Sequence, residues 1–337
     1  MTDYRSAGVD LNLGDSIKDH IAALIKRTHS ASVVTRGGEF GGVFRVPNSN
    51  VLAVTSIDGV GTKLLVAIAA GIHDTVGKDL VNHSVNDIAV MGATPAFFVD
   101  YFAAGKLNEN TVLEVIKGIT AACSEHEMAL VGGETAQMPD LYDENEYDLA
   151  GAITGFMSSE DPYLSRVVKS GDMIIGFKSN GLHTNGYSLA RKIVFSDSNW
   201  EIDTHNEELG TTWGSELLKV HRSYLNIIRD LIDNHEACRI AHITGGGIPG
   251  NMSRVLPEGI AAKIEVDKIP RQPVFSVLER AGAVSHEEMY EVFNMGCGML
   301  AVVPGKSVDN IVSKYEGDAF LCGSIISHEE RDKVVLV

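Results

Sequence analysis

Apolar residues recur along the chain with two spacings, one typical of strands and one typical of helices. The β-branched run at 51–57 predicts a strand, and the apolar segment 64–70, which stops at Gly71, predicts a helix. Residues 58–63 between them are therefore expected to form a turn from strand to helix.

The rest of the N-terminal half continues this alternation. Residues 1–50 are rich in glycine and weakly periodic, and they contain one short predicted helix around 19–27. We then expect helices over 79–90 and 112–123, and strands over 97–102, 129–131 and 150–156.

Periodicity lapses between residues 158 and 170, a polar stretch that contains Asp161-Pro162 and is the best candidate for a linker. The second half then predicts strands over 173–177, 299–303 and 334–337, and helices over 187–195 and 216–234. We therefore expect two α/β domains, 1–165 and 166–337.

Composition narrows the functional classes. The chain has 45 acidic and 28 basic residues, for a formal net charge of −17, and this field disfavours nucleic acid and membrane surfaces as partners. The four cysteines are far apart, which argues against a zinc site or a disulfide framework and fits a reduced compartment. Without an apolar leader or a run long enough to span a membrane, we expect a cytoplasmic protein.

The turn at 58–63 is the first candidate for chemistry. Its glycines, Gly59 and Gly61, would let the backbone approach a phosphate, Lys63 offers a cation, and Asp58 could hold a metal ion. The order of residues matches neither a Walker A loop nor a Rossmann fingerprint. A glycine-rich turn of this kind is more often structural, but the added Asp and Lys favour function.

Two further acidic residues complete a candidate cation site. Asp87 interrupts an apolar stretch, where a carboxylate must be paired or metal-bound, while Asp79 and His83 share its helical face and could equally be solvated. Glu134 follows an apolar strand and a Gly-Gly turn, which could also be an ordinary tight turn. If Asp58, Asp87 and Glu134 converge, they would bind a hard cation such as Mg²⁺.

The second half contributes two glycine-rich loops, 180–188 and 242–251, each before a predicted helix whose N-terminus could bind phosphate. His183 in the first loop could be a proton donor, a base or a charge stabiliser, or it could be polar filler. Because this loop is rich in glycine, we expect His183 to make few core contacts.

Taken in order, these segments resemble the aminoimidazole ribonucleotide synthetase family. The resemblance extends over nearly the whole chain. It rests on residues 7–10, 58–63, 85–93, 101–107, 131–138, 181–187, 244–247 and 286–298.

The resemblance implies two α/β sandwich domains: an N-terminal one whose sheet pairs with that of a second subunit in a homodimer, and a C-terminal one that closes the cleft. It also implies an ATP-dependent cyclo-ligase that forms a C–N bond in purine biosynthesis. Formylglycinamidine ribonucleotide and ATP would give aminoimidazole ribonucleotide, ADP and phosphate. ATP would phosphorylate the formyl oxygen, and the amidine nitrogen would then close the ring.

The resemblance also implies residue roles. It assigns ATP binding to Asp58, Gly59, Gly61, Thr62 and Lys63, catalysis to His183, Asn185, Lys63 and Asp87, substrate or phosphate binding to Thr244, Gly245, Gly246 and Gly247, and Mg²⁺ to Asp58, Asp87 and Glu134. One position departs from the family pattern, because Glu39 replaces a glycine of the N-terminal loop. We therefore assign no phosphate contact to that loop.

Alternatives of two classes stay open. One is another ATP-using member of the same superfamily, such as thiamine-monophosphate kinase. A selenophosphate synthetase would need a cysteine or selenocysteine near the N-terminus, and no cysteine precedes Cys123. The other class is a catalytically silent nucleotide-binding protein.

Overall fold

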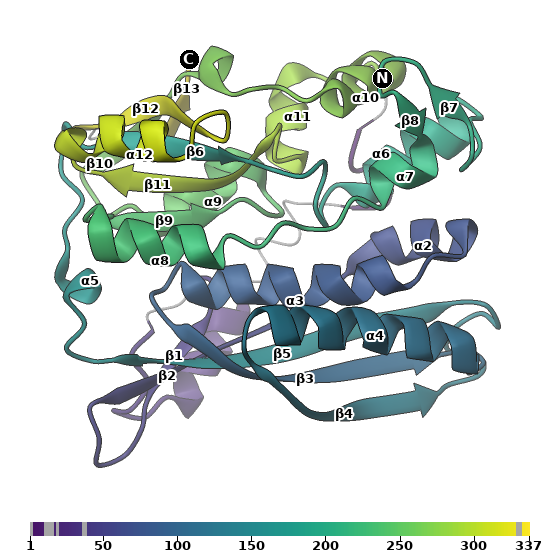
Figure 1. Ribbon diagram of the computed structural model, residues 1–337, viewed down its shortest axis with the longest axis horizontal. Helices are drawn as coiled ribbons and strands as arrows, with labels where there is room; N and C mark the ends of the chain where they lie inside the picture. The colour runs from purple at the N-terminus through teal and green to yellow at the C-terminus, as the bar shows by residue number, and fades with distance from the viewer. Residues whose placement is uncertain (1–2, 10–16, 18–19, 36–38, 328–331) are drawn as a thin grey trace.

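The computed structural model describes residues 3–9, 17, 20–35, 39–327 and 332–337. Two halves, each with its own sheet and helices, are stacked one above the other (Figure 1). Helices of the N-terminal half lie between its sheet and the C-terminal half, and they cover one face of that sheet (Figure 1). The glycines Gly37 and Gly38 and the start of the helix expected around 19–27 lie outside the described residues.

The N-terminal sheet has the order β1-β2-β5-β3-β4, in which β3 and β4 are parallel and the other neighbours are antiparallel. Helices α3 and α4 pack against each other over it (Figure 1). Its elements are β1 (Gly42–Arg45), β2 (Val51–Gly59), α2 (Leu64–Ala70), α3 (Asp74–Ala89), β3 (Thr94–Ala104), α4 (Glu109–Glu125), β4 (Ala129–Gln137) and β5 (Tyr147–Ser158).

The C-terminal sheet has the order β13-β10-β12-β6-β11-β9, in which only β10 and β13 are parallel among the described residues. All seven residues of β11 (Cys297–Val303), which lies between β6 and β9, are buried. The other strands are β6 (Met173–Lys178), β9 (Arg239–His242), β10 (Ile260–Ile264), β12 (Ala319–Ser327) and β13 (Val334–Leu336). The helices are α6 (Tyr187–Arg191), α7 (Trp213–Leu217), α8 (Leu225–Asn234), α9 (Gly247–Val255), α10 (Pro273–Gly282), α11 (His286–Val292) and α12 (Val308–Lys314).

The alternation of faces along β2 and β3 separates a covered side of the N-terminal sheet from an open side. Leu52, Val54 and Phe98 are buried beneath the helices, whereas Ile57 and Val99 on the other side are 74% and 36% exposed. Phe44, Val131 and Phe156 are further exposed apolar residues of this sheet. An apolar sheet face of this kind typically meets a partner.

Most expected elements of both halves are present, and the mixed α/β fold is confirmed. The single helix expected over 216–234 is wrong: α7 ends at Leu217, α8 begins at Leu225, and residues between them form neither helix nor strand. The expected linker contains the one-turn helix α5 (Pro162–Ser165), where Asp161 accepts a hydrogen bond from the Tyr163 amide.

No helix among the described residues combines the length and apolar character needed to cross a bilayer.

Candidate functional site

Helix α3 carries a polar face that is buried where the two halves meet. Asp79, Asn82, His83, Asn86 and Asp87 follow helical spacing, and all five are buried. Buried polar groups of this kind need partners. The expectation that the face could be solvated is therefore wrong.

This face of α3 makes hydrogen bonds to the backbone of the segment that lies between α7 and α8. Asp79 accepts a hydrogen bond from the His221 amide at 2.6 Å, and Asn82 donates to the His221 carbonyl at 2.7 Å. Asn86 donates to the Arg222 carbonyl at 2.9 Å and accepts from the Tyr224 amide at 2.8 Å. These bonds replace the helical bonds that the segment would otherwise make, and they hold the halves together.

Lys63 is also part of this seam, where its ammonium group faces acceptors of the protein itself. Its side chain is fully buried, and its Nζ lies 2.8 Å from Asp79 Oδ2. It also donates to the carbonyls of His183 and Lys219 at 3.0 and 2.7 Å. Burial lowers the pKa of Lys63 and raises that of Asp79, and each charge opposes the shift of the other. Because three acceptors surround Nζ, we assign it the ammonium form.

Phosphate binding by Lys63 stays a prediction, which the contacts of its ammonium group in the structure do not favour. Every N–H of its ammonium group has an acceptor within the protein. The side chain thereby links the turn that follows β2 to the C-terminal half. Thr62 in the same turn lies 3.1 Å from the Ser188 hydroxyl, oxygen to oxygen. Gly61 has a φ of +69°, which the turn requires and which favours glycine.

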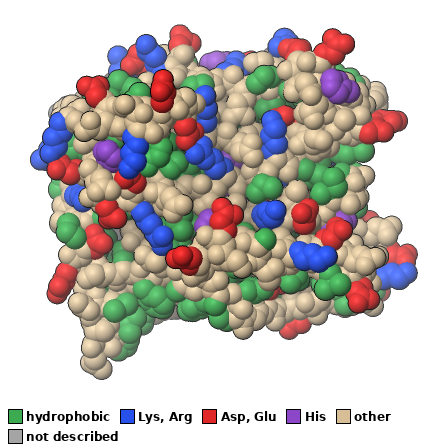
Figure 2. Space-filling view, in the orientation of Figure 1, with side chains coloured by type: hydrophobic (Ala, Val, Ile, Leu, Met, Phe, Trp, Pro, Cys, Tyr) green, Lys and Arg blue, Asp and Glu red, His purple; other side chains and the backbone are tan. Residues whose placement is uncertain are grey.

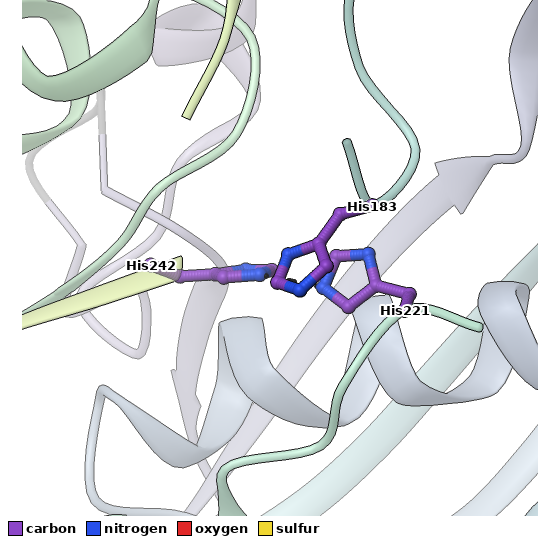
Figure 3. A group of neighbouring side chains, drawn as sticks. All are labelled: His183, His221 and His242. Atoms are coloured by element: carbon purple, nitrogen blue, oxygen red, sulfur yellow. Dashed lines mark hydrogen bonds between the residues drawn. The ribbon is translucent and has the colours of Figure 1, made fainter. Parts of the chain in front are cut away.

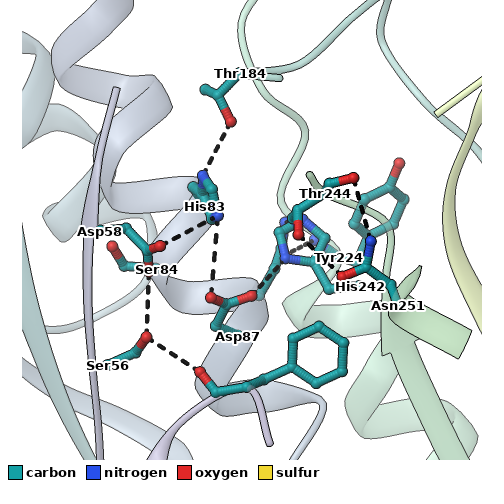
Figure 4. A network of polar contacts seen from close by, with 12 residues as sticks. Ser56, Asp58, His83, Ser84, Asp87, Thr184, Tyr224, His242, Thr244 and Asn251 are labelled. Carbon is teal, nitrogen blue, oxygen red and sulfur yellow. Dashed lines mark hydrogen bonds and ion pairs between the residues drawn. The ribbon is translucent and has the colours of Figure 1, made fainter. Parts of the chain in front are cut away.

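Asp58 and Asp87 do come together, as Figure 4 shows. Asp58 ends β2 on the covered side of the sheet, and Asp87 lies opposite it on α3. Burial raises the pKa of Asp87 well above its usual value, the His83 ring opposes this, and the Asp58 carboxylate adds to it. Two carboxylates in such proximity repel each other unless a proton or a cation lies between them.

His242, at the end of β9, reaches Asp87 from the C-terminal half. Its Nδ1 lies 2.7 Å from Asp87 Oδ1, and its Nε2 lies 2.9 Å from His221 Nε2. Burial lowers the pKa of His242 to about 3, so the ring is neutral. The sequence did not single out this residue, although it directly precedes the glycine-rich loop.

His183 is fully buried, which contradicts the expectation of few core contacts. Its ring stacks on that of His221 with centroids 4.0 Å apart, and Nε2 accepts a hydrogen bond from the Asn180 amide at 3.0 Å (Figure 3). A Cβ on Gly298 would lie 2.7 Å from its Cε1, so the packing is tight. Burial lowers its pKa well below the usual value.

The loop at 244–247 is held by one side chain. Asn251 on α9 donates to the carbonyls of Thr244, Gly245 and Gly247 and accepts from the Thr244 hydroxyl. Gly247 has a φ of +58°, and a Cβ there would lie 1.8 Å from the Tyr290 carbonyl oxygen. Glycine is therefore needed for close packing at this position.

Gly246, with a φ of +91°, completes the turn into α9. Gly245 is exposed, and a Cβ on it would lie 3.2 Å from Asn185 Oδ1. The two glycine-rich loops expected to face substrate thus meet at Asn185, which donates a hydrogen bond to the Thr184 hydroxyl.

Glu134 does not join the carboxylate pair within one chain. It is exposed on the edge strand β4 and is in register with Tyr101, so both point to the same side of the sheet. Tyr101 alternates with the buried Phe102, which places this side away from the helices. The three-carboxylate site is corrected to a pair, Asp58 and Asp87.

A cavity of about 450 Å³ lies between the N-terminal sheet and α9. Phe40, Met91 and Tyr163 contribute apolar wall, and the Arg254 guanidinium lies 5.3 Å from the centre of the Phe40 ring. Arg254 has no carboxylate partner within the described ranges, and its charge acts on both Asp87 and His242. No pattern in the sequence singles out Arg254, since a single arginine on a helix is commonplace.

Two family models match the chain, one on each half. The N-terminal domain model of AIR synthase related proteins matches residues 38–157, and the corresponding C-terminal domain model matches residues 169–335. Among solved structures, the hydrogenase maturation protein HypE in complex with ATP has a TM-score of 0.61 at 15% identity, covering 87% of this chain and 83% of that one. Thiamine-monophosphate kinase from Stenotrophomonas maltophilia has a TM-score of 0.59 at 15% identity, covering 94% of both chains. At this identity the likeness shows a shared fold.

Curated relatives are similar over almost the full length. A phosphoribosylformylglycinamidine cyclo-ligase from Syntrophotalea carbinolica is 43% identical, covering 97% of this chain and 95% of the relative. One from Geobacter sulfurreducens is 42% identical, covering 98% and 97%. With both halves matched and this identity across them, the chain belongs to the family of phosphoribosylformylglycinamidine cyclo-ligases, the AIR synthetases.

Proposed function

We propose that this protein closes the imidazole ring of 5-aminoimidazole ribonucleotide from formylglycinamidine ribonucleotide, using ATP and releasing ADP and phosphate. The observation that carries the proposal is the similarity to cyclo-ligases over both halves, at 43% identity and 97% coverage. It is supported by a carboxylate pair at the seam between the halves, opposite the loops of Asn185 and Gly245. Small-molecule sites often lie in a cleft between domains, and both substrates of this reaction are anionic small molecules.

The proposed chemistry starts with transfer of the ATP γ-phosphoryl group to the formyl oxygen, which makes that oxygen a leaving group. The amidine nitrogen then attacks the carbon, and phosphate departs. Asp58 and Asp87 would hold Mg²⁺, which supplies charge neutralisation for the transferred phosphoryl group. Their fit to a cation rests on the mutual repulsion of two close carboxylates.

The protein's other groups would bind and orient the substrates. The exposed amides near Gly245 and the N-terminus of α9 are suited to a phosphate, and Asn185 to a polar group of the glycinamidine. Arg254 would supply positive charge beside the carboxylate pair. Lys63 and His183 would act indirectly, by fixing the position of the C-terminal half.

We also propose a cytoplasmic homodimer. The support is the open apolar face of the N-terminal sheet, on which Ile57 and Val131 are 74% and 60% exposed. Covering this face in a second subunit would bury apolar area that is otherwise in water.

An assay for ADP release tests the function. Purified protein with Mg²⁺, ATP and formylglycinamidine ribonucleotide should release ADP and form aminoimidazole ribonucleotide in equal amounts, and no ADP should form without the ribonucleotide. Thiamine monophosphate in its place separates the kinase alternative, because it should give no ADP. If ADP is released with thiamine monophosphate but not with formylglycinamidine ribonucleotide, the protein is not a cyclo-ligase. If neither compound supports ADP release, a catalytically silent nucleotide-binding protein is favoured.

A further inference from the structure

His83 lies at the carboxylate pair but has no part in the function proposed so far. Its Nε2 is 3.6 Å from Asp58 Oδ1 and 3.9 Å from Asp87 Oδ2 (Figure 4). The side chains of His83 and Asp87 are each 9% exposed and that of Asp58 is 23% exposed, so a small ion can reach them from solvent. Two ligand atoms that are each about 2.1 Å from one ion lie roughly 3 to 4 Å apart, which is the spacing seen here.

The side chains of Asp58, His83 and Asp87 each contact a further residue. In each case the contact uses an atom other than the one that faces the space between the three side chains. Ser56 donates to Asp58 Oδ2 at 3.2 Å, and His242 Nδ1 lies against Asp87 Oδ1. Thr184 Oγ1 lies 2.9 Å from His83 Nδ1. This leaves Asp58 Oδ1, Asp87 Oδ2 and His83 Nε2 facing one another. Outer partners that orient ligands in this way are typical of metal centres.

The direction of the hydrogen bonds shows which nitrogen of His83 is free. With Asp87 ionised, His242 must donate through Nδ1, so its Nε2 accepts from His221 Nε2. Neutral His221 then accepts at Nδ1 from the Thr184 hydroxyl, at 3.2 Å. The Thr184 oxygen in turn accepts from His83 Nδ1, so Nε2 presents a lone pair to two carboxylate oxygens. A lone pair that faces two carboxylates is stable when a proton or a cation lies between them, and a divalent cation there would bind all three groups.

The neighbouring trio of His183, His221 and His242 is a poorer candidate. Their ligand atoms lie within 4.8 Å of one another, as do those of His83, Asp87 and His242. The rings of His183 and His221 are stacked, however, so their lone pairs do not converge, and His183 Nε2 already accepts from a backbone amide.

We propose that His83 Nε2 is a third protein ligand to the divalent cation at Asp58 and Asp87, making this a mixed nitrogen and oxygen site that prefers Mn²⁺ to Mg²⁺. Imidazole ligation suits transition ions, whereas Mg²⁺ prefers oxygen alone. The inference rests on the cation site of the proposed function and adds the ligand that sets its metal preference.

The test uses the full-length protein with Mn²⁺ as the probe, observed by pulsed electron paramagnetic resonance and by calorimetry. The wild type should show the ¹⁴N coupling of a coordinated imidazole and bind Mn²⁺ more tightly than Mg²⁺. His83→Ala and His83→Asn should lose the coupling and bind Mn²⁺ about 10 to 100 times more weakly, with a smaller change for Mg²⁺. His73→Ala, a half-buried histidine whose ring contacts Tyr147, is the matched control and should keep both properties.

Two results would overturn the proposal, and they are distinguishable. If Mn²⁺ binds and Asp87→Asn abolishes binding, but the wild type shows no ¹⁴N coupling, the carboxylate site stands and His83 is not a ligand. If neither ion binds, or if Asp87→Asn has no effect on binding, the cation site itself is wrong and the proposed function loses that part. A wild-type spectrum without ¹⁴N coupling overturns the proposal even if the His83 variants do not fold.

Discussion

At the residue scale, the ammonium group of Lys63 connects the two halves. A lysine that loses its solvation on burial is stable only when all its N–H groups have acceptors, and here they are Asp79 and two backbone carbonyls. Removing one partner of such a pair leaves the other charge buried and unpaired.

Lys63→Met should therefore lower the free energy of unfolding by about 3 to 5 kcal/mol, measured by denaturant titration. The double variant Lys63→Met/Asp79→Asn should recover much of this loss, because it removes the orphaned charge and keeps the oxygen that accepts from the His221 amide. A single variant with unchanged stability and a raised KM for ATP would instead show that Lys63 binds the nucleotide.

His183 predicts a pH dependence of stability. Burial lowers the pKa of His183 well below 6.5, its ordinary value, so below that pH the unfolded chain takes up a proton that the folded protein does not. Stability is then lost as the pH falls through about 6.5, by at most about 1.4 kcal/mol per pH unit for this residue, until the folded pKa is reached.

Urea midpoints at pH 7.5, 6.5 and 5.5 test this. His183→Gln should depend less steeply on pH than the wild type below 6.5. His286→Gln, at an exposed histidine whose side chain is 59% exposed, should run parallel to the wild type. If the His183 and His286 variants give the same slope as the wild type, His183 is protonated in the folded protein.

At the scale of elements, the segment between α7 and α8 differs from the helix that the sequence pattern predicts, because of its contacts with the rest of the protein. Residues 216–234 have helical periodicity, which is clearest in α8. However, the side chains of Asn82 and Asn86 donate hydrogen bonds to the backbone carbonyls of His221 and Arg222. Such long-range competition is invisible in a local pattern. The strands and helices expected in the N-terminal half were predictable, because their apolar faces pack on one sheet.

The same division applies to the site. Asp58 and Asp87 were predictable, since each is a carboxylate in an apolar run, and the structure brings them together. The burial of Lys63 and His183 was not predictable, because it depends on contacts with residues more than 30 positions away in the sequence, such as the bonds of Lys63 to the carbonyls of His183 and Lys219 and the stacking of His183 on His221. The role of Glu134 was misjudged because strand alternation, which decides its side of the sheet, depends on the register of β3 and β4.

Asn86→Ala tests the seam at this scale. It should destabilise the protein by about 1 to 3 kcal/mol per orphaned buried group and speed hydrogen exchange at the Tyr224 amide, which donates to Asn86 Oδ1. Asn234→Ala, near the exposed end of α8, is the control and should change neither. Unchanged exchange at Tyr224 in the Asn86 variant would mean that the segment is held by other contacts.

At the scale of the whole molecule, the open face of the N-terminal sheet predicts self-association. Light scattering at micromolar concentration should give the mass of a dimer, and Ile57→Lys should shift it toward the monomer by placing a charge on that face. Lys106→Ala, at a side chain that is 66% exposed and paired with Glu144, is the control. A monomer of the wild-type chain at that concentration would contradict the proposed dimer.

The most direct test of the proposed reaction follows one oxygen atom. With formylglycinamidine ribonucleotide labelled with ¹⁸O at the formyl group, the account predicts that the label appears in inorganic phosphate, one atom for each aminoimidazole ribonucleotide formed, because the formyl oxygen is phosphorylated and then leaves. Mass spectrometry of the phosphate measures this. Label found in water, with unlabelled phosphate, would contradict phosphorylation of the formyl oxygen and with it the mechanism proposed for this protein.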